Sequence, residues 1–200
     1  MAMKNDREIY FSCDIEADGP IPAEYSMLSL GAAAFSEDGK MLDTFSINLK
    51  TLDGAKQHPD TMAWWKTQWA AYEESRKNQV DPKAAMFQFS NWIKKTCEKY
   101  EGKPVLVGYP AGFDFTFIYW YLVKFTGESV VGFSCLDMKS FVMPVLGVSF
   151  RNAVKRVMPK SWFAGGKKHT HIAIDDAIEQ GELFMGMLKA SKNLVEKSDV

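Results

Sequence analysis

The chain has 200 residues, of which 46% are hydrophobic, and this size and composition favour one globular domain over two. Its 24 basic and 25 acidic residues give a net charge of −1, which argues against a protein that wraps long nucleic acid through an overall positive field. The polar first eight residues contain no signal-type apolar run, and no apolar stretch is long enough to span a bilayer.

The first part of the chain alternates apolar and polar residues with the period of two that is typical of strands. This pattern covers residues 8–16, 27–35 and 41–49, and a turn at 36–40 joins the last two segments. We expect an antiparallel meander of three strands. A short helix near residues 60–68 and an amphipathic helix over 82–100 should follow it.

The second part alternates between strand and helix patterns. We expect a buried strand at 103–109, an aromatic helix at 113–124, a strand near 132–136, a helix at 137–146 and a final helix from 172. Three antiparallel strands followed by alternating elements predict an α/β fold. Its mixed sheet, of three antiparallel strands plus parallel strands, is flanked by helices as in the ribonuclease-H-like fold.

A linker-like stretch at 147–169 separates the last two helices. It contains Gly165-Gly166 and a group of basic residues, which either follow the phosphates of a substrate or belong to a solvated loop. They are Arg151, Lys155, Arg156, Lys160, Lys167 and Lys168.

The cysteines indicate where the protein resides. Cys13, Cys97 and Cys135 are widely spaced and match no metal-binding or disulfide pattern, which favours a reducing compartment. We therefore expect a cytoplasmic single domain over residues 1–200, with a core from about 7 to 190, a polar C-terminal tail and no membrane partner.

Two acids stand at the end of the first predicted strand. Asp14 and Glu16 are two residues apart, so both project from the same face. Neighbouring carboxylates repel each other unless a cation lies between them, and such oxygen ligands favour Mg²⁺ or Mn²⁺. Taken alone, the pair is more often an ordinary solvated strand end.

Two further acids lie where such a site would need them. Asp114 follows a predicted strand and a small-residue turn, in the first turn of a helix. Near the last helix, Asp175 falls on the polar stripe, whereas Asp176 borders the apolar stripe and should face inward. An inward acid needs a compensating partner, and a metal shared with the other acids would provide it.

These residues form three motifs that resemble those of the DEDDh exonucleases, a family that includes oligoribonuclease, ribonuclease T and bacterial polymerase proofreading subunits. The motifs are Asp14-x-Glu16, then Phe113-Asp114 preceded by Gly108-Tyr109-Pro110-Ala111, then His171-x-Ala173-x-x-Asp176-Ala177. Residues 60–68 also resemble a segment of the ribonuclease-T-like branch, which is common in phages and bacteria.

The resemblance implies a metal-dependent 3′→5′ exonuclease that acts on the 3′ end of single-stranded RNA or DNA. Two Mg²⁺ or Mn²⁺ ions would be held by carboxylates, with Asp14 bridging both and His171 as the general base. The remaining ligands would be Glu16, Asp114 and Asp176. His169 is interpreted as a solvated loop residue, although spacing alone leaves open that the two histidines exchange roles.

The chain departs from the family pattern at two places. Many relatives have Asn two residues before the Phe-Asp pair, or His-Asn a few residues earlier, where this chain has Tyr109-Pro110-Ala111-Gly112. After the first motif, Ala17-Asp18-Gly19-Pro20 replaces a Thr-Thr-Gly type of segment. These changes concern substrate preference and the floor of the pocket.

Four residues are candidates for nucleic-acid contacts: Ala17, Met27, Trp65 and Phe113. Each has a packing alternative, since Met27 and Phe113 suit a core, and of Trp64 and Trp65 one should be core and the other a substrate contact. The helix at 113–124 is apolar all round, which predicts either burial under a second layer or a homodimer.

Two other functions remain open from the residues. The first is a noncatalytic nucleic-acid-binding or scaffold protein of the same fold, which the complete set of acids argues against. The second is a ribonuclease-H-like endonuclease, which would share the acids but would not need the His-x-Ala-x-x-Asp motif.

Overall fold

The computed structural model describes residues 7–163 and 170–198, and its centre is a five-stranded sheet in the order β3-β2-β1-β4-β5. β1 (Glu8–Ala17) pairs antiparallel with β2 (Met27–Ser36), which pairs antiparallel with β3 (Met41–Asn48). β4 (Lys103–Gly108) and β5 (Leu136–Asp137) are parallel to β1 and to each other. The predicted mixed α/β sheet, with three antiparallel strands plus parallel strands, is confirmed.

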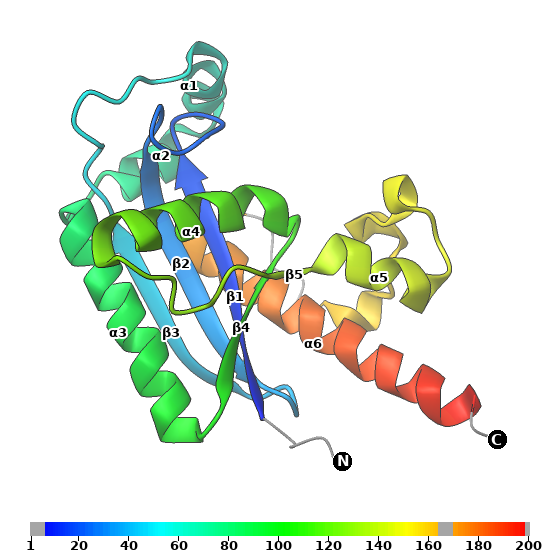
Figure 1. Cartoon of the computed structure of the whole chain (residues 1–200). Coiled ribbons are helices and arrows are strands. Elements are labelled where there is room, and N and C mark those ends of the chain that lie inside the picture. The colour runs from blue at the N-terminus through cyan, green and yellow to red at the C-terminus, as the bar shows by residue number, and fades with distance from the viewer. Residues whose placement is uncertain (1–6, 164–169, 199–200) are drawn as a thin grey trace.

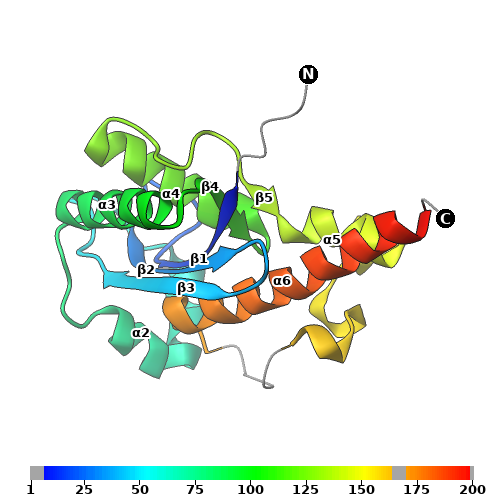
Figure 2. The same ribbon diagram turned by 90° about the horizontal axis from the view of Figure 1, so that it is seen from below.

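Helices cover both faces of this sheet. Figures 1 and 2 show α3 (Pro82–Tyr100) and α4 (Ala111–Thr126) on one face and α6 (Ala173–Ser198) across the other, with α5 (Met138–Leu146) beside α6. The shorter helices are α1 (Pro59–Trp65), α2 (Trp69–Ser75) and the 3₁₀ turns η1 (Lys66–Gln68), η2 (Phe150–Asn152), η3 (Lys155–Val157) and η4 (Lys160–Trp162).

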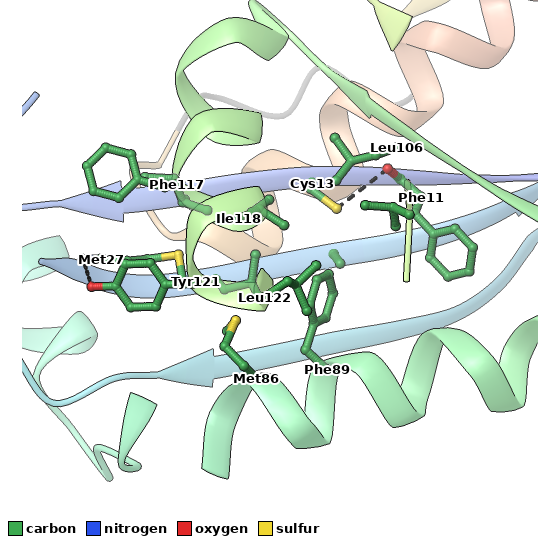
Figure 3. Packing of buried hydrophobic residues seen from close by; sticks show 14 of the residues in the cluster. Phe11, Cys13, Met27, Met86, Phe89, Leu106, Phe117, Ile118, Tyr121 and Leu122 are labelled. Carbon is green, nitrogen blue, oxygen red and sulfur yellow. Dashed lines mark hydrogen bonds between the residues drawn. The ribbon is translucent and has the colours of Figure 1, made fainter. Parts of the chain in front are cut away.

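The alternation in β1 divides its side chains between the two layers. Phe11 and Cys13 face α3 and α4 in a core that includes Phe89 and Phe117 (Figure 3). Tyr10, on the opposite face, belongs to a second core and lies 5.1 Å, centroid to centroid, from Phe184 of α6. Even-numbered residues of β1 therefore face α6, which is the face from which Asp14 and Glu16 project.

A close approach between β2 and α6 sets the position of the first turn of α6. A Cβ atom on Gly31 would lie 2.2 Å from the carbonyl carbon of Ala173, so only glycine fits here. Gly31 is the register partner of Asp14 in β1. The predicted inward stripe of α6 is confirmed, because its members are buried while Asp175 is exposed. They are Ala173, Asp176, Ala177, Gln180, Phe184 and Met187.

Three expectations about the elements are corrected. The strand expected at 132–136 is the two-residue β5, because Gly132 adopts a turn conformation with a φ of +73°. The helix expected near 60–68 consists of α1 and the 3₁₀ turn η1, and a further helix, α2, follows that was not expected. The part of the linker that the structure describes packs through buried Ala153 and Met158 and is not simply a solvated loop. Gly165-Gly166, Lys167, Lys168 and His169 lie outside the described residues.

No helix within residues 7–163 and 170–198 combines the length and the apolar character needed to cross a membrane.

Candidate active site

Three elements bring the four predicted acids to one end of the sheet. Asp14 and Glu16 come from the end of β1, Asp114 from the first turn of α4 and Asp176 from the first turn of α6. Asp114 Oδ1 accepts a hydrogen bond of 3.1 Å from the backbone nitrogen of Ile15, which fixes α4 to β1 between the first two acids. The carboxylates of Glu16 and Asp176 approach each other and the His171 ring, with potential ligand atoms within 4.8 Å.

The electrostatics of this cluster are those of buried like charges. Burial raises the pKa of Asp14 well above its usual range, and the charges of Asp114, Glu16 and Asp176 raise it further. Burial, with Asp176 and Asp114, raises the pKa of Glu16 to about 9. Burial also raises the pKa of Asp114 to about 7 against the hydrogen bond from Ile15. Glu16 and Asp114 would therefore bind protons near neutral pH unless a cation balances them.

The chemistry of the donor set fits a divalent metal ion. Carboxylate oxygens are the ligands that Mg²⁺ and Mn²⁺ prefer, and a cation removes the repulsion that raises these pKa values. Gln180 supports the arrangement, since its Nε2 donates to Asp14 Oδ1 at 2.8 Å, while its Oε1 is buried and accepts no hydrogen bond from any described residue. Gln180 is buried on the inward face of α6, but residue spacing alone could not show its contact with Asp14.

His171 is held at the edge of the cluster by a strained loop. Its φ is +57°, a conformation that is uncommon for residues other than glycine. Its backbone nitrogen donates to Asp176 Oδ2 at 2.9 Å, and the Thr170 nitrogen donates to Oδ1 at 3.1 Å. The imidazole ring meets Trp64 edge to face, at 4.9 Å between centroids and 89° between planes. The structure therefore places His171 beside the acids, as the motif predicted.

The expectation that Trp65 contacts substrate is corrected, because its side chain is completely buried. The Trp65 indole nitrogen donates to the carbonyl oxygen of Ala17 at 3.0 Å and so ties α1 to the end of β1. Trp64 is the exposed member of the pair, at 40%. The helix period could not assign these two faces, since α1 has only seven residues and ends in a 3₁₀ turn.

Of the other three predicted substrate contacts, two are buried residues and one is an exposed residue. Met27 is fully buried, and its backbone nitrogen donates to the Tyr121 hydroxyl at 2.8 Å (Figure 3), so its side chain offers no surface to substrate. Ala17 is buried at the end of β1. Phe113 is 41% exposed, one residue before Asp114, and it stays a candidate contact.

Asp137 is an acid near the site that the sequence analysis did not single out as functional. Its Oδ1 accepts from the backbone nitrogen of Ala111 at 3.0 Å, and its Oδ2 accepts from that of Ser140 at 2.8 Å. It thus orients the first turn of α4, which carries Asp114. Four hydrogen bonds outweigh the effect of burial and lower the pKa of Asp137. The position of Asp137 at the end of a strand is the sequence feature that could have indicated a role near the site.

Comparison with known proteins identifies the family. The family model of the 3′-5′ exoribonuclease Rv2179c-like domain matches residues 10–187. The chain belongs to this family. It is a 3′-5′ exonuclease, and therefore a hydrolase of nucleic acid. The DEDDh resemblance is confirmed, and the exonuclease interpretation is favoured over the scaffold and endonuclease alternatives.

Individual relatives agree with this assignment. The 3′-5′ DNA exonuclease Cap18 of Escherichia coli is 34% identical over 195 residues, which cover 95% of this chain and 97% of that protein. The nuclease domain of 3′hExo, a DEDDh family member bound to rAMP, superposes with a TM-score of 0.64 at 10% identity over 94% of each chain. E. coli exonuclease I in complex with a dT13 oligonucleotide gives 0.67 at 12% identity over 96% of this chain and 43% of that one. These two structures support the fold.

Proposed function

We propose that this exonuclease is metal-dependent and removes nucleotides from the 3′ end of single-stranded nucleic acid. Two Mg²⁺ or Mn²⁺ ions would be held by four carboxylates, of which one is Asp14. The other ligands are Glu16, Asp114 and Asp176. When bound, such ions lower the pKa of water and stabilise the charge that develops on the phosphate.

The observation that supports this proposal most strongly is the convergence of four acids, from β1, α4 and α6, at one end of the sheet. Asp114 and Asp176 are 5% and 1% exposed, and burial, together with the charges of neighbouring acids, raises the pKa of both Asp14 and Glu16. A protein that used these residues only to stabilise its fold would gain from replacing them with apolar side chains of similar size. A bound divalent cation would stabilise the four acids in this arrangement.

The remaining residues position and deprotonate the attacking water. His171 is half-buried at the edge of the cluster, where its ring can accept a proton from the attacking water. Asp176 holds the backbone on both sides of this loop through the nitrogens of Thr170 and His171. We assign the general-base role to His171 for these reasons.

A pocket beside Trp64 can receive the terminal base. Its volume is about 330 Å³, and it is lined by Pro20, His58, Asp60, Thr61 and Trp64. An exposed indole can stack on any base, which suits an enzyme that removes nucleotides irrespective of sequence. Phe113, on the α4 side of the cluster, is the second exposed aromatic residue for this purpose.

We also infer a homodimer formed through α4. Tyr119 and Val123 are one helical turn apart and are 37% and 40% exposed, so they form an apolar stripe. Sedimentation velocity at micromolar concentration should give twice the monomer mass, and Tyr119→Ser/Val123→Ser should give the monomer. A monomeric wild-type protein would remove this inference.

Product analysis tests the proposed function. The protein is incubated with 5′-labelled single-stranded RNA and DNA of the same sequence, because the family description names an exoribonuclease and the E. coli relative is a DNA exonuclease. We expect a ladder that shortens one nucleotide at a time from the 3′ end on at least one substrate. Internal fragments would indicate an endonuclease instead, and absence of products on both would reject the proposal.

A further inference from the structure

The charges of this chain are unevenly distributed along the sequence. Between Asp137 and Asp175 there are seven of the 24 basic residues and no acidic residue. The rest of the chain therefore carries all 25 acidic residues and only 17 basic ones. The net charge of −1 is therefore the sum of one strongly basic segment and an acidic remainder of the chain.

Residues 153–155 of this segment lie beside the two helices that carry Asp114 and Asp176. The Tyr109 hydroxyl donates to the carbonyl oxygen of Ala153 at 3.0 Å, and Tyr109 directly precedes the turn into α4. The Lys155 ammonium is 2.9 Å from the Glu179 carboxylate, one turn beyond Asp176 in α6. Figure 1 shows η2 to η4, in yellow, beside α6 and on the side of the molecule away from α3. The segment therefore borders both helices that supply catalytic acids.

Three cations of this segment are available to a ligand. Arg151, Arg156 and Lys160 are exposed, and within residues 7–163 and 170–198 no ion pair joins them to a carboxylate. Phe150 is 49% exposed next to Arg151. The α1–α2 side of the site differs, since residues 50–81 contain five basic and five acidic residues. Charge thus distinguishes the two sides.

We propose that this basic surface, formed by Phe150, Arg151, Arg156 and Lys160, binds the part of the nucleic-acid strand that lies 5′ to the scissile bond. The inference rests on the proposed function, which places the 3′ end among the acids. Lysine and arginine side chains bind phosphates with release of counterions, and an exposed aromatic ring stacks on bases that are unpaired. A single strand can use both kinds of contact, whereas a duplex hides the faces of its bases.

Binding is measured separately from hydrolysis. A fluorescent single-stranded dodecamer of RNA or DNA, whichever the wild-type enzyme hydrolyses, is titrated with protein in the Asp14→Asn background at several NaCl concentrations. The surface variant is Arg151→Ser/Arg156→Ser/Lys160→Ser. The matched control, Lys83→Ser/Lys95→Ser/Lys99→Ser, removes the same charge from exposed positions of α3 on the other face of the sheet.

We expect the surface variant to bind at least about tenfold more weakly at low salt. The slope of its log K against log[salt] should fall by about 2, because each phosphate that a cation neutralises on a single strand contributes ~0.7 to that slope. The control should bind like the parent. If the surface variant and the control have the same affinity and slope, the inference is wrong. Absence of hydrolysis by the wild-type enzyme would instead count against the proposed function.

Phe150→Leu separates stacking from charge. Stacking releases no counterions, so this variant should weaken binding by a similar factor, about 5- to 50-fold, at every salt concentration. An affinity equal to that of the parent would show that the ring is not part of the surface.

Discussion

At the scale of single residues, Gln180 shows how a neutral side chain orients a charged one. Its amide nitrogen donates to Asp14 Oδ1 at 2.8 Å and turns that carboxylate into the cluster. This donor also lowers the pKa of Asp14, against burial and the neighbouring charges. Outer hydrogen bonds of this kind tune how well a ligand binds its metal.

Gln180→Leu should therefore weaken Mn²⁺ binding, measured by isothermal titration calorimetry, by about 10- to 100-fold. The matched control is Gln88→Leu, the same change at an exposed position of α3, which should bind Mn²⁺ like the wild type. Equal affinity in the two variants would mean that Gln180 only fills space.

Trp64 and His171 form a second pair whose roles can be separated. Because the indole meets the imidazole at 4.9 Å, Trp64 should hold the His171 ring in place as well as line the pocket for the base. His171→Ala alone should lower kcat by about 10²–10⁴-fold. Trp64→Ala should lower kcat in the wild-type enzyme but cause no further loss of kcat once His171 is absent, while raising KM in both backgrounds.

Single-turnover and steady-state kinetics of the four proteins measure this coupling. Trp69→Ala is the control, since Trp69 is 51% exposed in α2 and packs on Tyr72. If Trp64→Ala lowers kcat by the same factor with and without His171, the indole does not act through the imidazole.

At the scale of elements, the site depends on how closely α6 approaches the sheet. Gly31 lies opposite Asp14 in the β1–β2 register, and its missing side chain leaves room for the backbone of Ala173. The first turn of α6, with Asp176, can approach Asp14 only because of this gap. One glycine therefore links the stability of the fold to the proposed metal site.

Gly31→Ala should push the first turn of α6 away from β2. We expect a loss of about 1–3 kcal/mol in the free energy of unfolding and a weaker Mn²⁺ affinity, because overpacking against backbone cannot be relieved by a rotamer change. Gly112→Ala is the comparison, since a Cβ there meets no atom within 4 Å. It should be neutral or slightly stabilising in urea unfolding. Similar unfolding curves for both variants would contradict this account.

The elements also show what the sequence could predict. Strands β1 to β3 and helix α3 were foreseen because their apolar periods of 2 and 3.6 run over eight or more residues. Asp14, Glu16 and Asp176 were assigned to the correct faces by the same periods. The bounds of the short elements, two-residue β5 and seven-residue α1, could not be predicted from the sequence. These elements depend on tertiary contacts, such as the hydrogen bond from Trp65 to Ala17, which no local sequence pattern contains.

At the scale of the whole molecule, the sheet carries the main apolar core on one face and the charged site at one end. Its α3–α4 face holds the larger apolar core, and the four acids meet at one end of the sheet, from β1, α4 and α6. The four acids would be costly without a cation, and the basic surface would have no evident use without a polyanion. On the proposed function, a metal ion and a nucleic-acid strand would account for these two features of charge.

The most direct test of this account compares hydrolysis by the wild type, Asp14→Asn and Asp176→Asn on a 5′-labelled single strand, with Mg²⁺, with Mn²⁺ and with EDTA. We predict stepwise shortening from the 3′ end by the wild type, with either metal, that EDTA abolishes. Both variants should lose at least about 10²-fold in rate while keeping the wild-type circular dichroism spectrum. Near-wild-type turnover of either variant in Mg²⁺, or undiminished wild-type hydrolysis in EDTA, would contradict the assignment of the four carboxylates to a metal site.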